Sequence, residues 1–147
     1  MKETVSKHYL SVAAGLIIRN GMLLITQRPA GSHLQGLWEF PGGKQEENES
    51  LEQCLEREIE EELGLKVRAK KALLTVAHEY DTHIVMLHVF ECGIIEGKPE
   101  CLQCQKFRWV KPSRLKAYSL APADRKFIEL FELKESVRYQ KQVAEWN

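Results

Sequence analysis

Three glutamates near the middle of the chain have the spacing of a metal-binding cluster. Glu58, Glu61 and Glu62 lie at positions i, i+3 and i+4, so a helix would place their carboxylates on one face. Like charges at these spacings repel one another, and Arg57 is the only basic residue between positions 45 and 65. Grouped carboxylates suit Mg²⁺ or Mn²⁺, which bind through carboxylates and substrate phosphates. The alternative interpretation is a solvated acidic helix face.

A glycine-rich turn, Phe40-Pro41-Gly42-Gly43, lies just upstream of this acidic segment. Glycines allow backbone carbonyls and amides to approach an ion or a phosphate closely. A loop of this kind leading into a carboxylate-lined helix predicts a site for a metal ion and a polyphosphate.

The overall charge balance excludes several broad classes of protein. The 147 residues contain 21 Lys and Arg and 21 Asp and Glu, yet residues 46–62 alone carry a net charge of −8. Neutrality argues against a general binder of nucleic-acid polymers. No apolar run approaches the roughly 18–20 residues of a membrane span, and the N-terminus lacks an apolar leader. We therefore expect no membrane association, and the four cysteines, too few for a disulfide scaffold, predict a cytoplasmic location. A monomer and a homodimer both stay open.

Two of the four cysteines, Cys101 and Cys104, form a CxxC pair. Such a pair is either half of a zinc site or two reduced thiols without a metal. The other two, Cys54 and Cys92, stand alone and do not supply a second half-site.

The hydrophobic pattern predicts one helix around the acidic cluster. Ser50 and Gln53 resemble a capping box before it, and Gly64 suits the left-handed position after it. The apolar face of this helix consists of Leu51, Cys54, Leu55, Ile59 and Leu63.

Strand-forming runs flank this helix and predict a mixed α/β fold in a single domain, residues 1–147. Asn20-Gly21 is a hairpin signal between the first two runs. Residues 28–43 are rich in Gly and Pro and are expected to be mostly loop. Pro122 could open a C-terminal helix with an apolar stripe at Phe127, Leu130, Phe131, Lys134 and Val137. The expected strands are 9–18, 22–26, 72–77, 83–92 and 107–110.

One motif makes the chain similar to a known family. Gly43, Glu49 and the segment 57–65 match every fixed position of the Nudix box, which spans residues 43–65. The flanking segments 25–28, 37–44 and 120–124 resemble the bacterial MutT and CTP pyrophosphohydrolase branch of that family. The resemblance implies a mixed β-sheet sandwiched between helices.

The resemblance also implies an activity, which is Mg²⁺-dependent hydrolysis of a nucleoside triphosphate to the monophosphate and pyrophosphate. The leading substrate is 8-oxo-dGTP, and the alternative is CTP or a modified pyrimidine triphosphate. A third interpretation, of another class, is a Nudix domain that binds nucleotides with little or no cleavage.

Site residues follow from the motif positions. The resemblance implies metal ligation by Glu58, Glu61, Glu62 and the Gly42 carbonyl, and a catalytic role for Glu58 and Glu61. It makes Arg57 a residue that orients carboxylates, with Gly43 and Glu49 as structural support. It implies that the nucleotide contacts Arg28, His33, Glu39, Phe40 and Asp124.

Two of these positions have alternative interpretations, and Asp124 and a further position, Gln103, depart from the family pattern. Phe40 could be a core residue, and Asp124 could be placed by a helix N-terminus. Asp124 also stands where MutT proteins usually have asparagine, and an ionised aspartate accepts hydrogen bonds but cannot donate them. Gln103 stands where the MutT pattern has a further glutamate, so Glu100, Glu58 or Glu61 would have to act as general base.

Overall fold

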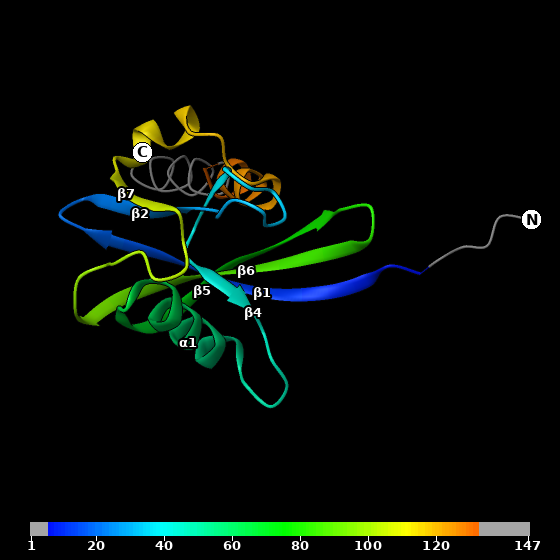
Figure 1. Cartoon of the computed structure of the whole chain (residues 1–147), viewed down its shortest axis with the longest axis horizontal. Helices are drawn as coiled ribbons and strands as arrows, with labels where there is room; N and C mark the ends of the chain where they lie inside the picture. Colours follow the sequence, from blue (N-terminus) through cyan, green and yellow to red (C-terminus); the bar gives the residue numbers. More distant parts are fainter. Residues whose placement is uncertain (1–5, 133–147) are drawn as a thin grey trace, which may run out of the picture.

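The computed structural model describes residues 6–132, and its centre is one mixed β-sheet (Figure 1). The strand order is β3-β2-β1-β6-β5, with β4 paired to β1 and β7 paired to β2. β1 and β6 run parallel, whereas every other pair is antiparallel. The seven strands are β1 (His8–Arg19), β2 (Met22–Gln27), β3 (Trp38–Glu39), β4 (Gly42–Lys44), β5 (Lys66–Glu79), β6 (His83–Glu96) and β7 (Lys106–Val110).

Helices cover both faces of this sheet. Successive strand residues point to opposite faces, so Ala13 packs into the core cluster beneath helix α1 (Leu51–Leu63), while Ala14 packs into the cluster on the other face. The second cluster includes Phe127 of the helix 122–132 and Leu115 of the 3-10 helix η1 (Pro112–Ala117). Figure 1 shows α1 below the sheet and the C-terminal helix above it. The predicted sandwich of a mixed sheet between helices is confirmed.

The caps predicted for α1 are present at both ends. The Ser50 hydroxyl accepts from Gln53 N at 3.0 Å, and the Gln53 side chain accepts from Ser50 N at 2.9 Å. Gly64 ends the helix with φ 67° and donates its N–H to the Glu60 carbonyl. Because both ends are fixed, the glutamates of the last two turns have a defined direction relative to the sheet.

The structure also differs from the sequence-based prediction in three places. β3 and the first two residues of β4 lie inside residues 28–43, which were expected to be mostly loop, because strands of two or three residues carry no readable alternation. β5 has 14 residues instead of the six predicted, since register shifts near Ala69 and Ala72 interrupt its pattern. η1 was not predicted, and Lys134 and Val137 lie outside the described residues.

Within residues 6–132, no helix is both long enough and apolar enough to cross a membrane.

Two adjacent glycines place β4 between β1 and α1. Gly42 pairs with Ala14 and Gly43 with Ala13. A methyl group on Gly42 would overlap the backbone carbonyl of Ala13, whereas one on Gly43 would overlap only the side chain of Glu58. The first overlap is with rigid backbone and the second is with a side chain that can rotate.

These contacts predict different costs for two neighbouring substitutions. We expect Gly42→Ala to lower the free energy of unfolding by about 1–3 kcal/mol, because the strand pairing must shift to relieve the overlap. Gly43→Ala is the matched control and should cost less, because Glu58 can turn away. Urea denaturation measures both, and equal losses would contradict the assignment of strain to the Ala13 carbonyl.

Candidate active site

Arg57 holds several acidic side chains at the junction of α1 and β4. Its Nε donates to Glu49 Oε2 at 2.9 Å and its Nη2 to Glu49 Oε1 at 2.7 Å, a bidentate pair. Its Nη1 donates to Glu58 Oε1 at 2.9 Å and to Glu61 Oε2 at 3.1 Å. Its Nη2 also donates to the Lys44 carbonyl at 3.2 Å. One guanidinium therefore joins three carboxylates of the acidic segment to the backbone of β4.

Glu49 also stabilises the loop that precedes the helix. Its Oε1 accepts from the Glu46 N–H at 2.8 Å, and its backbone carbonyl accepts from the Gln45 side chain at 2.8 Å. The hydrogen bonds from Arg57 and from the Glu46 amide lower the pKa of Glu49 to about 2. Glu49 therefore stays ionised at every pH at which the protein would function.

The next carboxylates along the helix are in a different environment. Glu62 is 9% exposed, and burial, together with the nearby charge of Glu39, raises its pKa to about 7. Burial also raises the pKa of Glu58, although the contact with Arg57 opposes that shift. Removing a carboxylate from water disfavours its charged form unless a cation compensates. Glu62 has no ion pair among the residues described.

Glu58 and Glu62 line a pocket between α1 and β4, which we call the helix pocket. Gly42, Gly43, Arg28 and Glu39 also line it. Its other lining residues are Gln27, Pro29, Lys44, Gln103 and Cys104.

The donor set of the helix pocket fits a divalent cation, although the carboxylates are not gathered around a single point. Among residues 6–132, no three His, Cys, Asp or Glu side chains form an assembled metal site. Glu58 and Glu61 face Arg57 instead, while Glu62 is buried without a positive partner. A cation in the pocket would offset the cost of burying Glu58 and Glu62, because both contribute hard oxygen donors to the same hollow.

Gln103, and not Glu100, lines the helix pocket. Backbone hydrogen bonds fix this arrangement, since Gln103 N donates to the Glu62 carbonyl at 3.3 Å and Glu100 N to the Leu63 carbonyl at 2.9 Å. Glu100 would enter the pocket only if this loop moved. A neutral amide therefore occupies the place where the family pattern has an acid.

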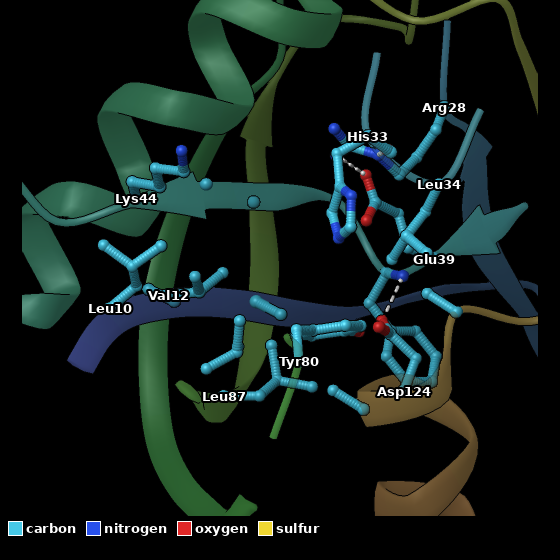
Figure 2. Close-up of a pocket in the computed structure, with 18 of the residues that line it drawn as sticks. Leu10, Val12, Arg28, His33, Leu34, Glu39, Lys44, Tyr80, Leu87 and Asp124 are labelled. Carbon is cyan, nitrogen blue, oxygen red and sulfur yellow. Dashed lines mark hydrogen bonds and ion pairs between the residues drawn. The ribbon is translucent and has the colours of Figure 1, made fainter. Parts of the chain in front are cut away.

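A second pocket opens between β1, β6 and the C-terminal helix, and we call it the sheet pocket (Figure 2). Its walls are aliphatic side chains from β1 and β6, including Leu10, Val12 and Leu87. Tyr80 lies across its base, and its polar groups come from Arg28, His33 and Asp124. Five residues line both pockets and form a shared wall: Arg28, Glu39, Gly42, Gly43 and Lys44.

Arg28 organises the loop that closes one side of the sheet pocket. Its Nε donates to the His33 carbonyl at 2.6 Å, and its Nη1 donates to Glu39 Oε1 at 3.1 Å. The His33 ring contacts Tyr80 edge-on at a centroid distance of 5.2 Å. Figure 2 shows His33 beside the pair of Arg28 and Glu39, facing the pocket.

Asp124 is completely enclosed at the opposite side of the sheet pocket. Its Oδ2 accepts from the Phe40 N–H at 2.9 Å, which ties the C-terminal helix to the chain between β3 and β4 (Figure 2). Burial raises the pKa of Asp124 well above its usual range, and the nearby charge of Glu39 adds to the shift. The Phe40 ring lies in the core against Phe127, so Phe40 combines core packing with a backbone contact at the site.

The structure thus brings the sequence-predicted residues into two adjoining pockets. Three of them, Glu49, Arg57 and Glu61, line neither pocket, and both glutamates pair with Arg57 instead. Sequence reasoning missed Lys44, Tyr80 and His83. Lys44 could have been found from its place beside Gly43, but the hairpin pair of Tyr80 and His83 carries no local signal.

Buried acids are concentrated at these two pockets. Among the described residues, burial raises the pKa of four carboxyl groups, and every one of them lines a pocket: Glu39, Glu58, Glu62 and Asp124. Perturbed carboxylates gathered in a cleft are a physical mark of a functional site.

Comparison with known proteins places this site in a family. A family model described as a NUDIX domain matches residues 13–130. The CTP pyrophosphohydrolase of Escherichia coli (strain K12) is 38% identical over 122 residues, 83% of this chain and 90% of that protein. The 8-oxo-dGTP diphosphatase of Proteus vulgaris is 48% identical over 84 residues, 56% of this chain and 75% of that protein.

A solved structure gives the same result for the fold. The crystal structure of a MutT protein from Methanosarcina mazei matches with a TM-score of 0.81 at 26% identity, over 90% of this chain and 99% of that one. Because a family model spans most of the sequence and a MutT structure shares the fold, the chain belongs to the Nudix hydrolases.

Proposed function

We propose that this chain, as one domain spanning residues 1–147, hydrolyses a nucleoside triphosphate to the monophosphate and pyrophosphate, with 8-oxo-dGTP as the leading substrate. The observation that carries this proposal is the shared wall of the two pockets. An apolar pocket with aromatic and polar groups suits a base, and an adjoining carboxylate pocket suits phosphates with a cation. Arg28 and Lys44 line both pockets and would contact the polyphosphate between them.

Nudix hydrolases generally use divalent metal ions, and for this chain we propose Mg²⁺, with Mn²⁺ as a possible substitute. Glu58, Glu61, Glu62 and the Gly42 carbonyl would hold the ion or ions. Bound metal would offset charge on the phosphate oxygens and lower the pKa of an attacking water.

The remaining roles belong to the side chains. Glu58 or Glu61 would accept the proton of the attacking water, since Gln103 cannot take one. Arg57 would keep these carboxylates oriented through the contacts it makes in the structure. Lys44 and Arg28 would bind the substrate electrostatically and keep its reacting phosphate in place.

Asp124 bears on the choice of base. Because burial raises its pKa well above its usual range, its neutral carboxylic acid can donate through O–H while the other oxygen accepts from Phe40. The sequence-based argument treated Asp124 as ionised, and an ionised aspartate can only accept hydrogen bonds. A neutral Asp124 offers both functions, as asparagine does, and this supports 8-oxoguanine. The runner-up remains CTP or a modified pyrimidine triphosphate, for which an ionised Asp124 would suffice.

The four cysteines are free thiols, which favours a reducing compartment. We therefore assign the reaction to the cytoplasm, where the protein would act as a monomer or a homodimer without contacting nucleic-acid polymers or membranes.

A pyrophosphate-release assay with Mg²⁺ and four triphosphates, 8-oxo-dGTP, dGTP, CTP and dCTP, tests this proposal. We expect release from 8-oxo-dGTP to exceed release from dGTP. Turnover of CTP far above that of 8-oxo-dGTP would favour the runner-up, and no release from any triphosphate would favour a domain that only binds nucleotides.

Replacement of one acidic group tests the catalytic assignment. We expect Glu61→Gln to lower kcat by at least ~100-fold, a typical loss for a group acting on the transition state. Glu60→Gln is the matched control, since Glu60 is exposed on the same helix and lines neither pocket. Near-normal turnover of the Glu61 variant would show that Glu61 neither binds metal nor acts as base.

The buried charge of Glu62 predicts a stability effect in metal-free protein. The pKa of Glu62 is about 7 in the folded chain against an ordinary 4.5. Stability is therefore lost as pH rises from about 4.5 to about 7, because ionisation favours the unfolded state. We expect Glu62→Gln in chelator to raise the free energy of unfolding at pH 8 by about 1–3 kcal/mol, with little change at pH 4.5.

Urea denaturation at the two pH values measures this difference. Added Mg²⁺ should stabilise the wild type more than the Gln variant, since the variant lacks the proposed ligand. A variant with the wild-type pH dependence would contradict a raised pKa at Glu62.

Two replacements of Asp124 test its protonation. Asp124→Asn keeps a donor and an acceptor, so kcat/KM should stay within about tenfold of wild type. Wild-type kcat/KM should fall at alkaline pH as the carboxyl ionises, whereas the Asn variant should lack this fall. Asp124→Ala leaves the Phe40 N–H unpaired and should cost about 1–3 kcal/mol of stability. Identical pH profiles for wild type and Asn would contradict a neutral Asp124.

A further inference from the structure

The CxxC pair lies in the loop between β6 and β7, beside the helix pocket. Cys101 is exposed, whereas Cys104 is partly buried and lines the pocket together with Glu58 and Glu62. The pair is thus the one feature singled out in the sequence that the hydrolysis reaction leaves without a role.

Backbone hydrogen bonds connect this loop directly to the carboxyl end of α1. The N–H groups of Leu102 and Gln103 donate to the Glu62 carbonyl at 2.9 and 3.3 Å. Leu102 and Gln103 are also the two residues between the cysteines. Any change in the backbone between the cysteines therefore acts on the helix turn that carries Glu62.

The local geometry brings the two thiols together. The backbone bends through residues 102–105, and Cys101 is a near neighbour of the Cys104 thiol. A disulfide needs Cα atoms about 4.4–6.8 Å apart, a range that residues i and i+3 of a tight turn can reach. Burial, with a smaller contribution from the neighbouring Cys101, raises the pKa of the Cys104 thiol, whereas Cys101 is exposed to oxidants in solution.

The other two cysteines are in a different position. Cys54 and Cys92 are buried in the core cluster beneath α1. Burial raises the pKa of Cys54 to about 11 and that of Cys92 to about 12, so both remain protonated and unreactive. An oxidant in solution therefore meets only the CxxC pair.

We propose that Cys101 and Cys104 form a redox-active dithiol that hydroperoxides oxidise to an intramolecular disulfide, and that this disulfide slows the reaction in the adjoining helix pocket. Formation of the disulfide depends only on the loop that carries the two cysteines. The effect on the reaction also rests on the proposed hydrolytic function.

The chemistry balances with hydrogen peroxide as the oxidant. The Cys101 thiolate attacks one peroxide oxygen, the O–O bond breaks, and Cys101 becomes a sulfenic acid while hydroxide leaves. The Cys104 sulfur then attacks the Cys101 sulfur, the S–S bond forms, the S–O bond breaks, and water leaves. In sum, two thiols and one peroxide give one disulfide and two waters.

The disulfide would alter the pocket through the same contacts. It would enclose Leu102 and Gln103 in a small ring and so restrict the backbone whose N–H groups donate to the Glu62 carbonyl. It would also tie Cys104, which lines the pocket, covalently to Cys101. Groups that orient a metal ligand from behind typically change activity by 10–100-fold when disturbed, so we expect kcat to fall by about tenfold.

The experiment treats the full chain with hydrogen peroxide and follows two properties, peptide mass and the rate of pyrophosphate release. We expect the peptide containing both cysteines to lose two hydrogen atoms, kcat to fall by about tenfold, and a dithiol reductant to restore both. Cys101→Ser is the matched control, because Cys101 lines neither pocket. Its reduced kcat should be normal, and peroxide should neither form the bridge nor slow it.

Several outcomes would overturn the proposal. Stable addition of oxygen to Cys101 without a bridge, or a bridge between two chains, would exclude the intramolecular dithiol. A bridge that forms without changing kcat would exclude the link to the pocket. If the reduced chain releases no pyrophosphate, the proposed hydrolytic function fails, while the peptide mass still decides whether the dithiol exists.

Discussion

The charge on Arg57 makes the rest of the site possible. Three carboxylates, those of Glu49, Glu58 and Glu61, converge on one guanidinium at 2.7–3.1 Å. Without it, like charges one helical turn apart would repel one another and disfavour the last turns of α1. Arg57 also donates to the Lys44 carbonyl, so the same group joins the helix to β4. One interaction therefore sets both the charge and the position of the pocket.

The site contains carboxylates that pair with Arg57 and others that are buried away from it, and the buried ones lower the stability of the fold when they are charged. Glu49, paired with Arg57, has a lowered pKa, whereas Glu62 and Asp124, away from it, have raised ones. A zero net charge conceals this division, because it sums a net charge of −8 over residues 46–62 with basic flanks. The cost of buried carboxylates is consistent with a fold that binds a small polyanion with its cations.

Much of the fold could be predicted from local patterns. The apolar face and both caps of α1 follow from five spaced residues and from Ser50, Gln53 and Gly64, so the prediction was accurate to the residue. Asn20-Gly21 forms a two-residue turn with φ values of 53° and 74°. β3 and β4 were missed because sheet pairing, not side-chain alternation, makes them strands. Their existence depends on β1 and β2, which contact them across the sheet.

The protonation states of the site residues could not be predicted from the sequence for a different reason. The ionisation of a carboxyl group depends on the residues that bury it. Sequence identifies Asp124 as an aspartate, and an exposed aspartate would be an anion that only accepts hydrogen bonds. Burial in the folded chain raises its pKa, although the hydrogen bond from the Phe40 N–H, 84 residues away in the sequence, opposes that shift. The CxxC pair illustrates the same dependence, since only the folded loop brings Cys104 to the pocket. Residue type fixes which protons a side chain can exchange, and tertiary contacts decide which of them it holds.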